Sequence, residues 1–176
     1  MSAAPIIISA MLSPDDLAWA DGLRRAHYPA DRNQLPAHLT LFHHLPPSAL
    51  DEIRRLLMAE ARMTARPAAR VARLLPLGRG VALGIESPGL AAIRGRIAQA
   101  LEGLLTPQDH AGWRPHITIQ NKAGASEARM LLQELQRDFA PRPITIIGLA
   151  AWWYRGGPWE PIANFKFSRP GLSRRH

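Results

Sequence analysis

The chain of 176 residues contains no cysteine, which excludes disulfide bonds and metal sites built on thiolates. It also lacks any apolar run near the roughly 18 residues that a membrane-spanning helix needs. The N-terminus has neither the basic segment nor the apolar segment of a signal peptide, so none is expected. These absences favour a cytoplasmic protein that does not bind membranes.

Lysine is also scarce, since the chain has 2 lysines against 20 arginines and a formal net charge of +8. A basic domain of this kind suggests a polyanionic partner. Arginine suits such a partner because its guanidinium binds phosphate through two parallel hydrogen bonds, which lysine cannot do. A bias toward arginine codons with a solvated surface explains the same composition, so charge alone does not identify the partner.

One short pattern, His-apolar-Thr-apolar, occurs twice in the chain, at 38–41 and at 116–119. Each copy reads as a strand, in which side chains at i and i+2 point to the same face, so each presents one imidazole and one hydroxyl together. Two histidines that face one substrate can supply a general base and a general acid. Two threonine hydroxyls can hold an anion between them. The candidate catalytic residues are therefore His38, Thr40, His116 and Thr118.

Strand alternation extends each motif face. Phe42 and His44 are expected on the face of the first motif, where Phe42 could stack a base, although a core role suits it better. Gln120 and Lys122 are expected on the face of the second motif and are candidate substrate-binding residues. Lys122, as one of the two lysines, could neutralise phosphate at the rim of the site.

His43 and His44 beside the first motif raise the question of a zinc site, because zinc favours histidine ligands. Adjacent strand residues point to opposite faces, however, and no Asp or Glu lies near either motif in the sequence. We therefore expect neither a metal site nor a cofactor.

The densest aromatic cluster is Trp152-Trp153-Tyr154, which Arg155 follows. Aromatic rings combined with arginine are typical of sites that bind single-stranded RNA. We expect at least one of these tryptophans in the core, which leaves Trp153 or Tyr154 as a candidate for stacking on a base.

Periodicity and turn residues predict an α+β fold in one domain, 1–176, whose apolar content of 47% is enough for a core. The order strand, helix, motif strand, helix, strand occurs twice, so we expect two pseudo-symmetric lobes of antiparallel sheet with outer helices around a central cleft. The lobes would span about 5–77 and 80–168, before a disordered basic tail at 169–176. Strands are expected at 6–11, 38–44, 71–77, 81–85, 116–120, 144–154 and 162–167. Helices are expected at about 14–27, from 48 onward, at 87–104 and at 126–139, with loops at 29–36 and 106–115.

The two motifs resemble those of the 2H phosphoesterase superfamily, in particular its bacterial 2′-5′ RNA ligase-like and cyclic phosphodiesterase branch. The resemblance rests on the first motif followed by Phe42, and on the second motif preceded by Arg114-Pro115. The fold that it implies covers roughly 5–168. Many relatives continue the first motif into a Leu-Gly turn, whereas this chain has His43-His44-Leu45-Pro46-Pro47.

The resemblance implies a metal-independent enzyme that hydrolyses 2′,3′-cyclic phosphates of RNA ends or nucleotides, with reversible 2′-5′ RNA ligation at the same site. It assigns His116 as the base for hydrolysis and His38 as the acid, and it points to a 2′-phosphate product. The expected partner is RNA or a nucleotide with a cyclic phosphate, and the expected state is a monomer. Two alternatives stay open, namely a different cyclic or 2′-linked phosphate substrate and an RNA-binding module without turnover.

Overall fold

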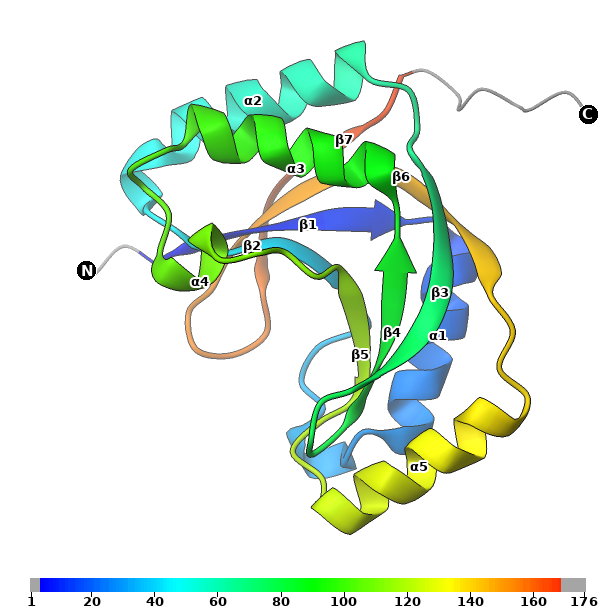
Figure 1. Ribbon diagram of the computed structural model, residues 1–176. Helices are drawn as coiled ribbons and strands as arrows, with labels where there is room; N and C mark the ends of the chain where they lie inside the picture. Colours follow the sequence, from blue (N-terminus) through cyan, green and yellow to red (C-terminus); the bar gives the residue numbers. More distant parts are fainter. Residues whose placement is uncertain (1–3, 169–176) are drawn as a thin grey trace, which may run out of the picture.

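The computed structural model describes residues 4–168 and shows a mixed α+β fold built on antiparallel strands, as predicted (Figure 1). Its strands are β1 (Ile6–Leu12), β2 (Leu39–Leu45), β3 (Ala68–Pro76), β4 (Val81–Glu86), β5 (His116–Gln120), β6 (Arg142–Trp153) and β7 (Glu160–Lys166). Its α-helices are α1 (Pro14–His27), α2 (Leu50–Met63), α3 (Pro88–Ala100), α4 (Pro107–His110) and α5 (Ala125–Arg137). The basic tail, predicted to be disordered, lies outside the described residues. None of the described helices is long and apolar enough to cross a membrane.

Within the described chain the strands form one sheet in the order β1-β2-β5-β4-β3-β6-β7, with a further pairing between β1 and β6. This further pairing closes the run from β1 to β6 into a ring of hydrogen-bonded neighbours. The ring has little strand pairing between β2 and β5, whose described register contains the single pair Leu39–Ile117. Strand pairing thus crosses between the two halves of the chain, and the division into lobes at about 5–77 and 80–168 stays a prediction.

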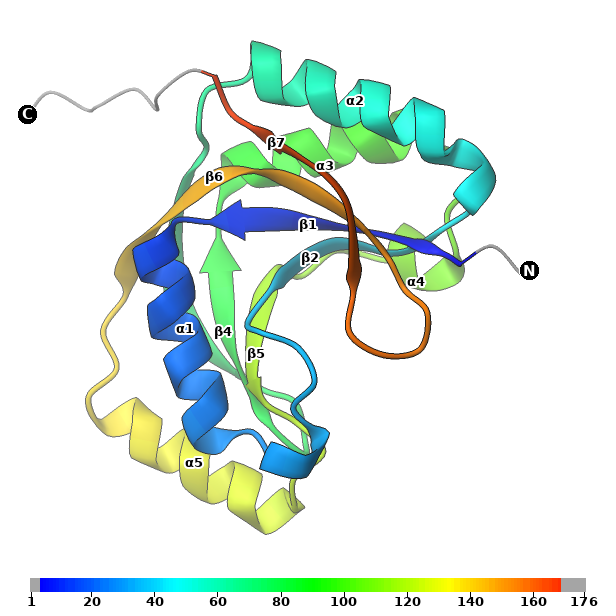
Figure 2. The same cartoon turned by 180° about the vertical axis from the view of Figure 1, so that it is seen from behind.

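Helices pack on the sheet in two groups (Figures 1 and 2). In the first group α2 packs on β6 and β7, and α3 packs on β3. In the second group α1 packs on β5, and α5 packs on β3 and β4. One continuous cluster of buried apolar side chains fills the space between helices and sheet.

Polar caps set where the helices begin. The Ser13 hydroxyl accepts a hydrogen bond from the Asp16 N–H at the start of α1, and α3 begins in the same way after Ser87. A proline follows each of these caps, where its fixed φ suits the first helical turn. The segment predicted as a loop before the second motif contains α4, because Thr106 caps the Asp109 N–H. The sequence did not predict α4, because so short a helix shows no repeating pattern of apolar residues.

The motif strands are anchored by their apolar positions. Leu39 and Leu41 in β2, and Ile117 and Ile119 in β5, are fully buried in the core. The motif histidines and threonines alternate with these residues and are half-buried, so they lie on the opposite face of the sheet. Burial of the apolar set therefore fixes which face carries the polar set.

Gly80 lets the β3–β4 hairpin approach the end of β5. A Cβ atom at this position would lie 1.8 Å from the carbonyl oxygen of Gln120. We expect Gly80→Ala to lower the free energy of unfolding by about 3 kcal/mol, because backbone atoms rather than a flexible side chain must move. Urea denaturation measures this loss. Gly112→Ala is the control, since no atom lies within 4 Å of its Cβ position; equal stability of the two variants would contradict the clash.

Candidate active site

The pair between β2 and β5 brings the two motifs together. Leu39 lies opposite Ile117 in an antiparallel register, so continuing that register by one residue sets each motif histidine opposite the threonine of the other motif. Side chains directly opposite have Cβ atoms about 5 Å apart, and diagonal neighbours about 7–8 Å. Continuing the register thus makes the two imidazoles diagonal neighbours on one face. The opposing pairs are His38 with Thr118 and His116 with Thr40.

Both histidines are held in the same way by the chain that precedes them. The Nδ1 of His38 lies 2.8 Å from the carbonyl oxygen of Pro36, and the Nδ1 of His116 lies 2.8 Å from that of Arg114. A carbonyl oxygen only accepts hydrogen bonds, so Nδ1 is the protonated nitrogen in both rings. The lone pair of the neutral ring is then on Nε2, which is free to take a proton or, once protonated, to give one.

The environment of His38 disfavours its charged form. Burial lowers the pKa of His38 to about 4, although the hydrogen bond to Pro36 opposes the shift. The positive charges of Arg24, His116 and His43 lower it further. The effect of His116 agrees with its diagonal placement. In the free protein at neutral pH, His38 is therefore neutral.

Two residues outside the motifs bind the motif strands. Arg24 of α1, which is 4% exposed, donates from Nη1 to the carbonyl oxygen of Thr118 at 3.0 Å and from Nε to Asn33 at 2.8 Å. Trp113 donates from Nε1 to the carbonyl oxygen of Thr40 at 3.1 Å. These hydrogen bonds stabilise β2 and β5 where the two strands share only one described residue pair. The sequence analysis missed both residues, because a single Arg on a helix and a single Trp in a loop carry no periodic signal.

A β-bulge after Thr40 ends the alternation predicted for the first motif. Thr40 keeps the motif register, but Phe42 pairs with Ile8 of β1, one residue out of that register. Phe42 is fully buried, so its predicted place on the motif face is wrong and its core role is confirmed. The same shift turns His43, instead of His44, toward the motif face.

The second motif has a matching bulge. After Thr118, the register shifts by one residue, and Gln120 pairs with the buried Val81 of β4. Gln120 is itself buried, so the prediction that it shares the motif face is wrong. Lys122 lies beyond β5 with a φ of 56°, which takes it out of the strand alternation. It is exposed, and its carbonyl oxygen accepts a hydrogen bond from Arg32 at 3.0 Å.

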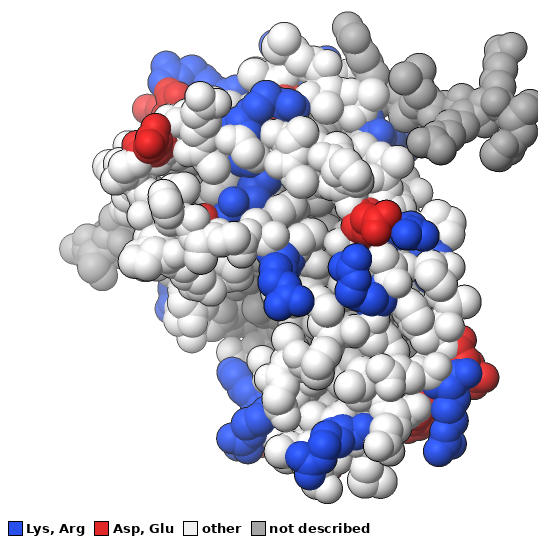
Figure 3. All heavy atoms as spheres, viewed as in Figure 1, with Lys and Arg blue, Asp and Glu red and all other residues white. Residues whose placement is uncertain are grey.

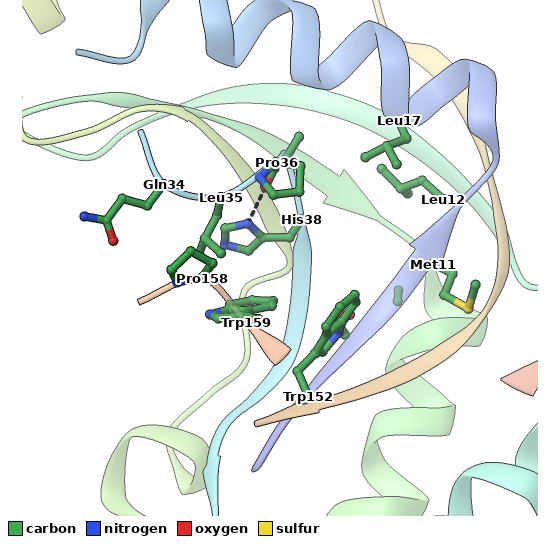
Figure 4. A pocket seen from close by; sticks show the side chains of 13 residues that line it. Met11, Leu12, Leu17, Gln34, Leu35, Pro36, His38, Trp152, Pro158 and Trp159 are labelled. Carbon is green, nitrogen blue, oxygen red and sulfur yellow. Dashed lines mark hydrogen bonds between the residues drawn. The ribbon is translucent and has the colours of Figure 1, made fainter. Parts of the chain in front are cut away.

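A cavity of about 320 Å³ opens beside His38 and is lined mostly by apolar and aromatic side chains (Figure 4). The ring centroid of Trp159 lies 4.5 Å from that of His38 and 6.0 Å from that of Trp152. The Nε1 of Trp152 donates to the Ser9 hydroxyl at 2.8 Å, which satisfies its polar atom. The predicted aromatic cluster thus contributes Trp152 to this cavity, whereas Trp153 packs against the core. Trp159 stands alone in the sequence and was not predicted.

The groups available for chemistry are imidazoles, hydroxyls and arginines. Among residues 4–168, no group of three or more His, Cys, Asp or Glu side chains is placed to hold a metal ion. His43 does meet a carboxylate, that of Asp109, which the sequence analysis missed because it lies 66 residues away. Figure 3 shows Lys and Arg side chains spread over one face of the molecule, with fewer acidic ones among them.

Comparisons with known proteins agree with this geometry. A family model described as the 2′-5′ RNA ligase superfamily matches residues 12–158. TT0787 of Thermus thermophilus is similar in structure, with a TM-score of 0.67 and 17% identity over 95% of this chain and 100% of that chain. E. coli LigT complexed with 3′-AMP has a TM-score of 0.60 and 15% identity over 96% of this chain and 100% of that chain. A search of curated proteins found no match.

At these identities the solved structures show the fold alone, and that fold is the one that the motifs predict. The family match also shows family membership, because it spans most of the chain and includes both motifs. The chain therefore belongs to the 2′-5′ RNA ligase superfamily, whose members are 2H phosphoesterases.

Proposed function

We propose that this protein is a metal-independent phosphodiesterase that hydrolyses 2′,3′-cyclic phosphates of RNA ends or nucleotides, with His38 and His116 as its acid-base pair. The observation that carries the proposal is the diagonal placement of two imidazoles whose Nδ1 protons are both held by backbone carbonyls. E. coli LigT has been crystallised with 3′-AMP, ATP, NADP+ and phosphate, which supports a phosphate-bearing ligand for this chain.

In the proposed reaction the cyclic phosphate lies between the two Nε2 atoms. One neutral Nε2 takes a proton from water as the water oxygen bonds to phosphorus, and the protonated Nε2 of the other ring gives its proton to the departing ribose oxygen. The hydroxyls of Thr40 and Thr118 donate to the non-bridging oxygens and stabilise their growing charge. Following the superfamily resemblance, we assign His116 as the base and His38 as the acid. With a ribose 5′-hydroxyl as the nucleophile in place of water, the same step opens the ring at the 3′ oxygen and forms a 2′-5′ bond.

The lowered pKa of His38 adds a requirement to this scheme. A neutral His38 cannot act as the acid until it gains a proton, and a bound cyclic phosphate anion favours that protonation. Substrate binding and proton uptake at His38 are therefore coupled. Lys122 is the proposed cation at the rim of the site, where its charge would attract the same anion. Together with Arg32 it borders a neighbouring hollow of about 240 Å³.

The cavity beside His38 suits the base of the bound nucleotide. Its wall includes His38 itself, so a base inside it lies next to the reacting phosphate. Trp152 and Trp159 offer aromatic surface, and aromatic stacking accepts every base because every base has a π-face. Gln34 is the one side chain with a free amide in the described cavity wall. The cavity therefore has few polar groups that could distinguish one base from another by hydrogen bonds.

Replacing Trp159 with alanine should raise the KM for a nucleoside 2′,3′-cyclic phosphate by about tenfold, since stacking on an aromatic side chain contributes about 1–3 kcal/mol per base. Initial rates over a range of substrate concentrations measure the change. A ribose 2′,3′-cyclic phosphate without a base is the control substrate, and its KM should change less. Met130→Ala removes an exposed apolar side chain of α5 outside the cavity and should leave the KM unchanged. Equal losses with both substrates would contradict base stacking in this cavity.

The pH profile of kcat/KM should be bell-shaped, with its acidic limb near pH 4. Activity needs one neutral and one protonated imidazole, and kcat/KM reports the free enzyme. Because burial lowers the pKa of His38 to about 4, the inactive doubly protonated form gathers only as the pH falls through that value. The acidic limb of kcat should lie higher, since the bound anion favours the imidazolium. An acidic limb of kcat/KM near 6.5, the ordinary value for histidine, would contradict this reading.

The direct test is turnover of a panel that contains the four nucleoside 2′,3′-cyclic phosphates, linear 2′-5′ dinucleotides and an RNA with a cyclic end. Chromatography of the products after incubation with and without EDTA gives rates and product identity. We expect hydrolysis of the cyclic phosphates that EDTA does not reduce. Tight binding of RNA without any product would indicate a binding module, and activity restored by added zinc after EDTA would indicate a metal enzyme.

A further inference from the structure

His43 and Asp109 form a pair that the proposed reaction does not use. Asp109 is 1% exposed, whereas the side chain of His43 is 41% exposed. The Nδ1 of His43 donates to Asp109 Oδ1 at 3.2 Å. The same carboxylate accepts the backbone N–H groups of His43 at 2.8 Å and His44 at 2.9 Å. One buried carboxylate thus fixes both the bulged backbone and the orientation of one imidazole.

The pair keeps a negative charge buried. Burial alone would raise the pKa of Asp109, but the hydrogen bonds from the His43 side chain and from the backbone of His43 and His44 outweigh it, so that the pKa is lowered. Arg94 lies close as well and donates to the carbonyl oxygen of Asp109 and, at 2.9 Å, to that of Leu41. Asp109 occupies Nδ1, so Nε2 is the ring nitrogen left for a ligand, and a bound phosphate stabilises its N–H form.

The bulge decides where this donor points. Without the register shift after Thr40, strand alternation would place His43 on the core face with Leu39 and Leu41. With the shift, His43 follows Thr40 on the motif face, and its charge is close enough to contribute to the lowered pKa of His38. It lies five residues beyond His38 along β2, away from the junction with β5. His43 therefore lies next to the site proposed for the reacting phosphate but is not part of that site.

We propose that His43, oriented by Asp109, binds a second phosphate, namely a phosphodiester further along the RNA strand whose cyclic end lies between His38 and His116. This inference rests on the proposed function and names its substrate class: an oligoribonucleotide end is preferred over a free nucleotide. A mononucleoside cyclic phosphate carries no such phosphodiester, so His43 gives it no contact. The formal net charge of +8 agrees with a substrate of several phosphates.

The test compares a trinucleotide ending in a 2′,3′-cyclic phosphate with the mononucleoside cyclic phosphate of the same terminal base. His43→Asn keeps a side-chain N–H for Asp109 and removes the free Nε2. We expect the ratio of kcat/KM for the trinucleotide to kcat/KM for the mononucleotide to fall by about tenfold, the size of one charge-assisted hydrogen bond. The loss should be in KM, and the steeper salt dependence of the trinucleotide should flatten. His44→Asn is the control, because its side chain is exposed and makes no contact with Asp109; the ratio should be unchanged.

Two results would overturn the inference while leaving the proposed function intact. An unchanged ratio in His43→Asn would show that no second phosphate meets His43. Equal losses for both substrates, with an unchanged salt dependence, would show that the pair only supports the bulge. A wild-type protein that hydrolyses neither substrate would contradict the proposed function itself, and this outcome is separate from the other two. Thermal unfolding of each variant tests that the fold is retained.

Discussion

Replacing either His38 or His116 with alanine should reduce turnover of a nucleoside 2′,3′-cyclic phosphate by about 10²–10⁴-fold, the usual contribution of a general acid or base. Each imidazole has its Nδ1 proton bound to a carbonyl oxygen, so Nε2 alone carries the chemistry and no other group in the motif replaces it. Because the acid and the base act in one step, the double variant should lose little more than the worse single variant. Single-turnover assays with excess enzyme measure the chemical step.

The controls separate chemistry from folding. His110→Ala removes an exposed imidazole at the end of α4 and should leave turnover unchanged. Thr40→Ala and Thr118→Ala should cost less than the histidine changes, because water can replace a hydroxyl donor in part. Circular dichroism should show that each variant keeps the wild-type fold, since both histidines are half-buried and contribute little to the core. Near-normal turnover in both histidine variants would contradict the mechanism.

Capping residues and strand alternation correctly predicted the limits of elements that depend on neighbouring residues alone. The limits of α1 follow from a serine cap, a proline and first-turn acids within four residues, and β5 has the predicted bounds because its alternation is regular as far as Thr118. The two His-Thr pairs were assigned to one face by alternation, and burial of Leu39 and Ile117 explains why that assignment agrees with the structure.

The predictions were wrong where the backbone departs from regular alternation. A bulge has no composition signal of its own, so Phe42 and Gln120 were assigned to the motif face although both pack inward. The groups that hold the site were missed for another reason. Arg24, Asp109 and Trp159 reach it from α1, from α4 and from the loop before β7, and only the tertiary fold brings them there.

The second large effect concerns substrate choice. We expect a nucleoside 2′,3′-cyclic phosphate to be cleaved about 10²-fold faster than a 3′-5′ dinucleotide. The five-membered ring is strained and an open diester is not, and about 3 kcal/mol of strain that is released in the transition state corresponds to that rate ratio. The described residues offer no cluster of carboxylates and histidines that would hold a metal to neutralise an unstrained diester. In the proposed mechanism the reaction rests on two imidazoles and two hydroxyls.

A side-by-side assay with resolution of the 2′- and 3′-monophosphates tests both the preference and the direction of ring opening. The superfamily resemblance implies that the 3′ oxygen departs, protonated by His38 in the proposed reaction, so the product should be the 2′-phosphate. His116→Ala should slow the cyclic substrate without changing which monophosphate forms, because in the proposed binding mode the base in the cavity orients the ribose and so selects the departing oxygen. Faster cleavage of the 3′-5′ dinucleotide would contradict the preference. A dominant 3′-monophosphate would instead mean that the ribose binds with its 2′ oxygen toward the acid, so that the two oxygens exchange roles while the two histidines keep theirs.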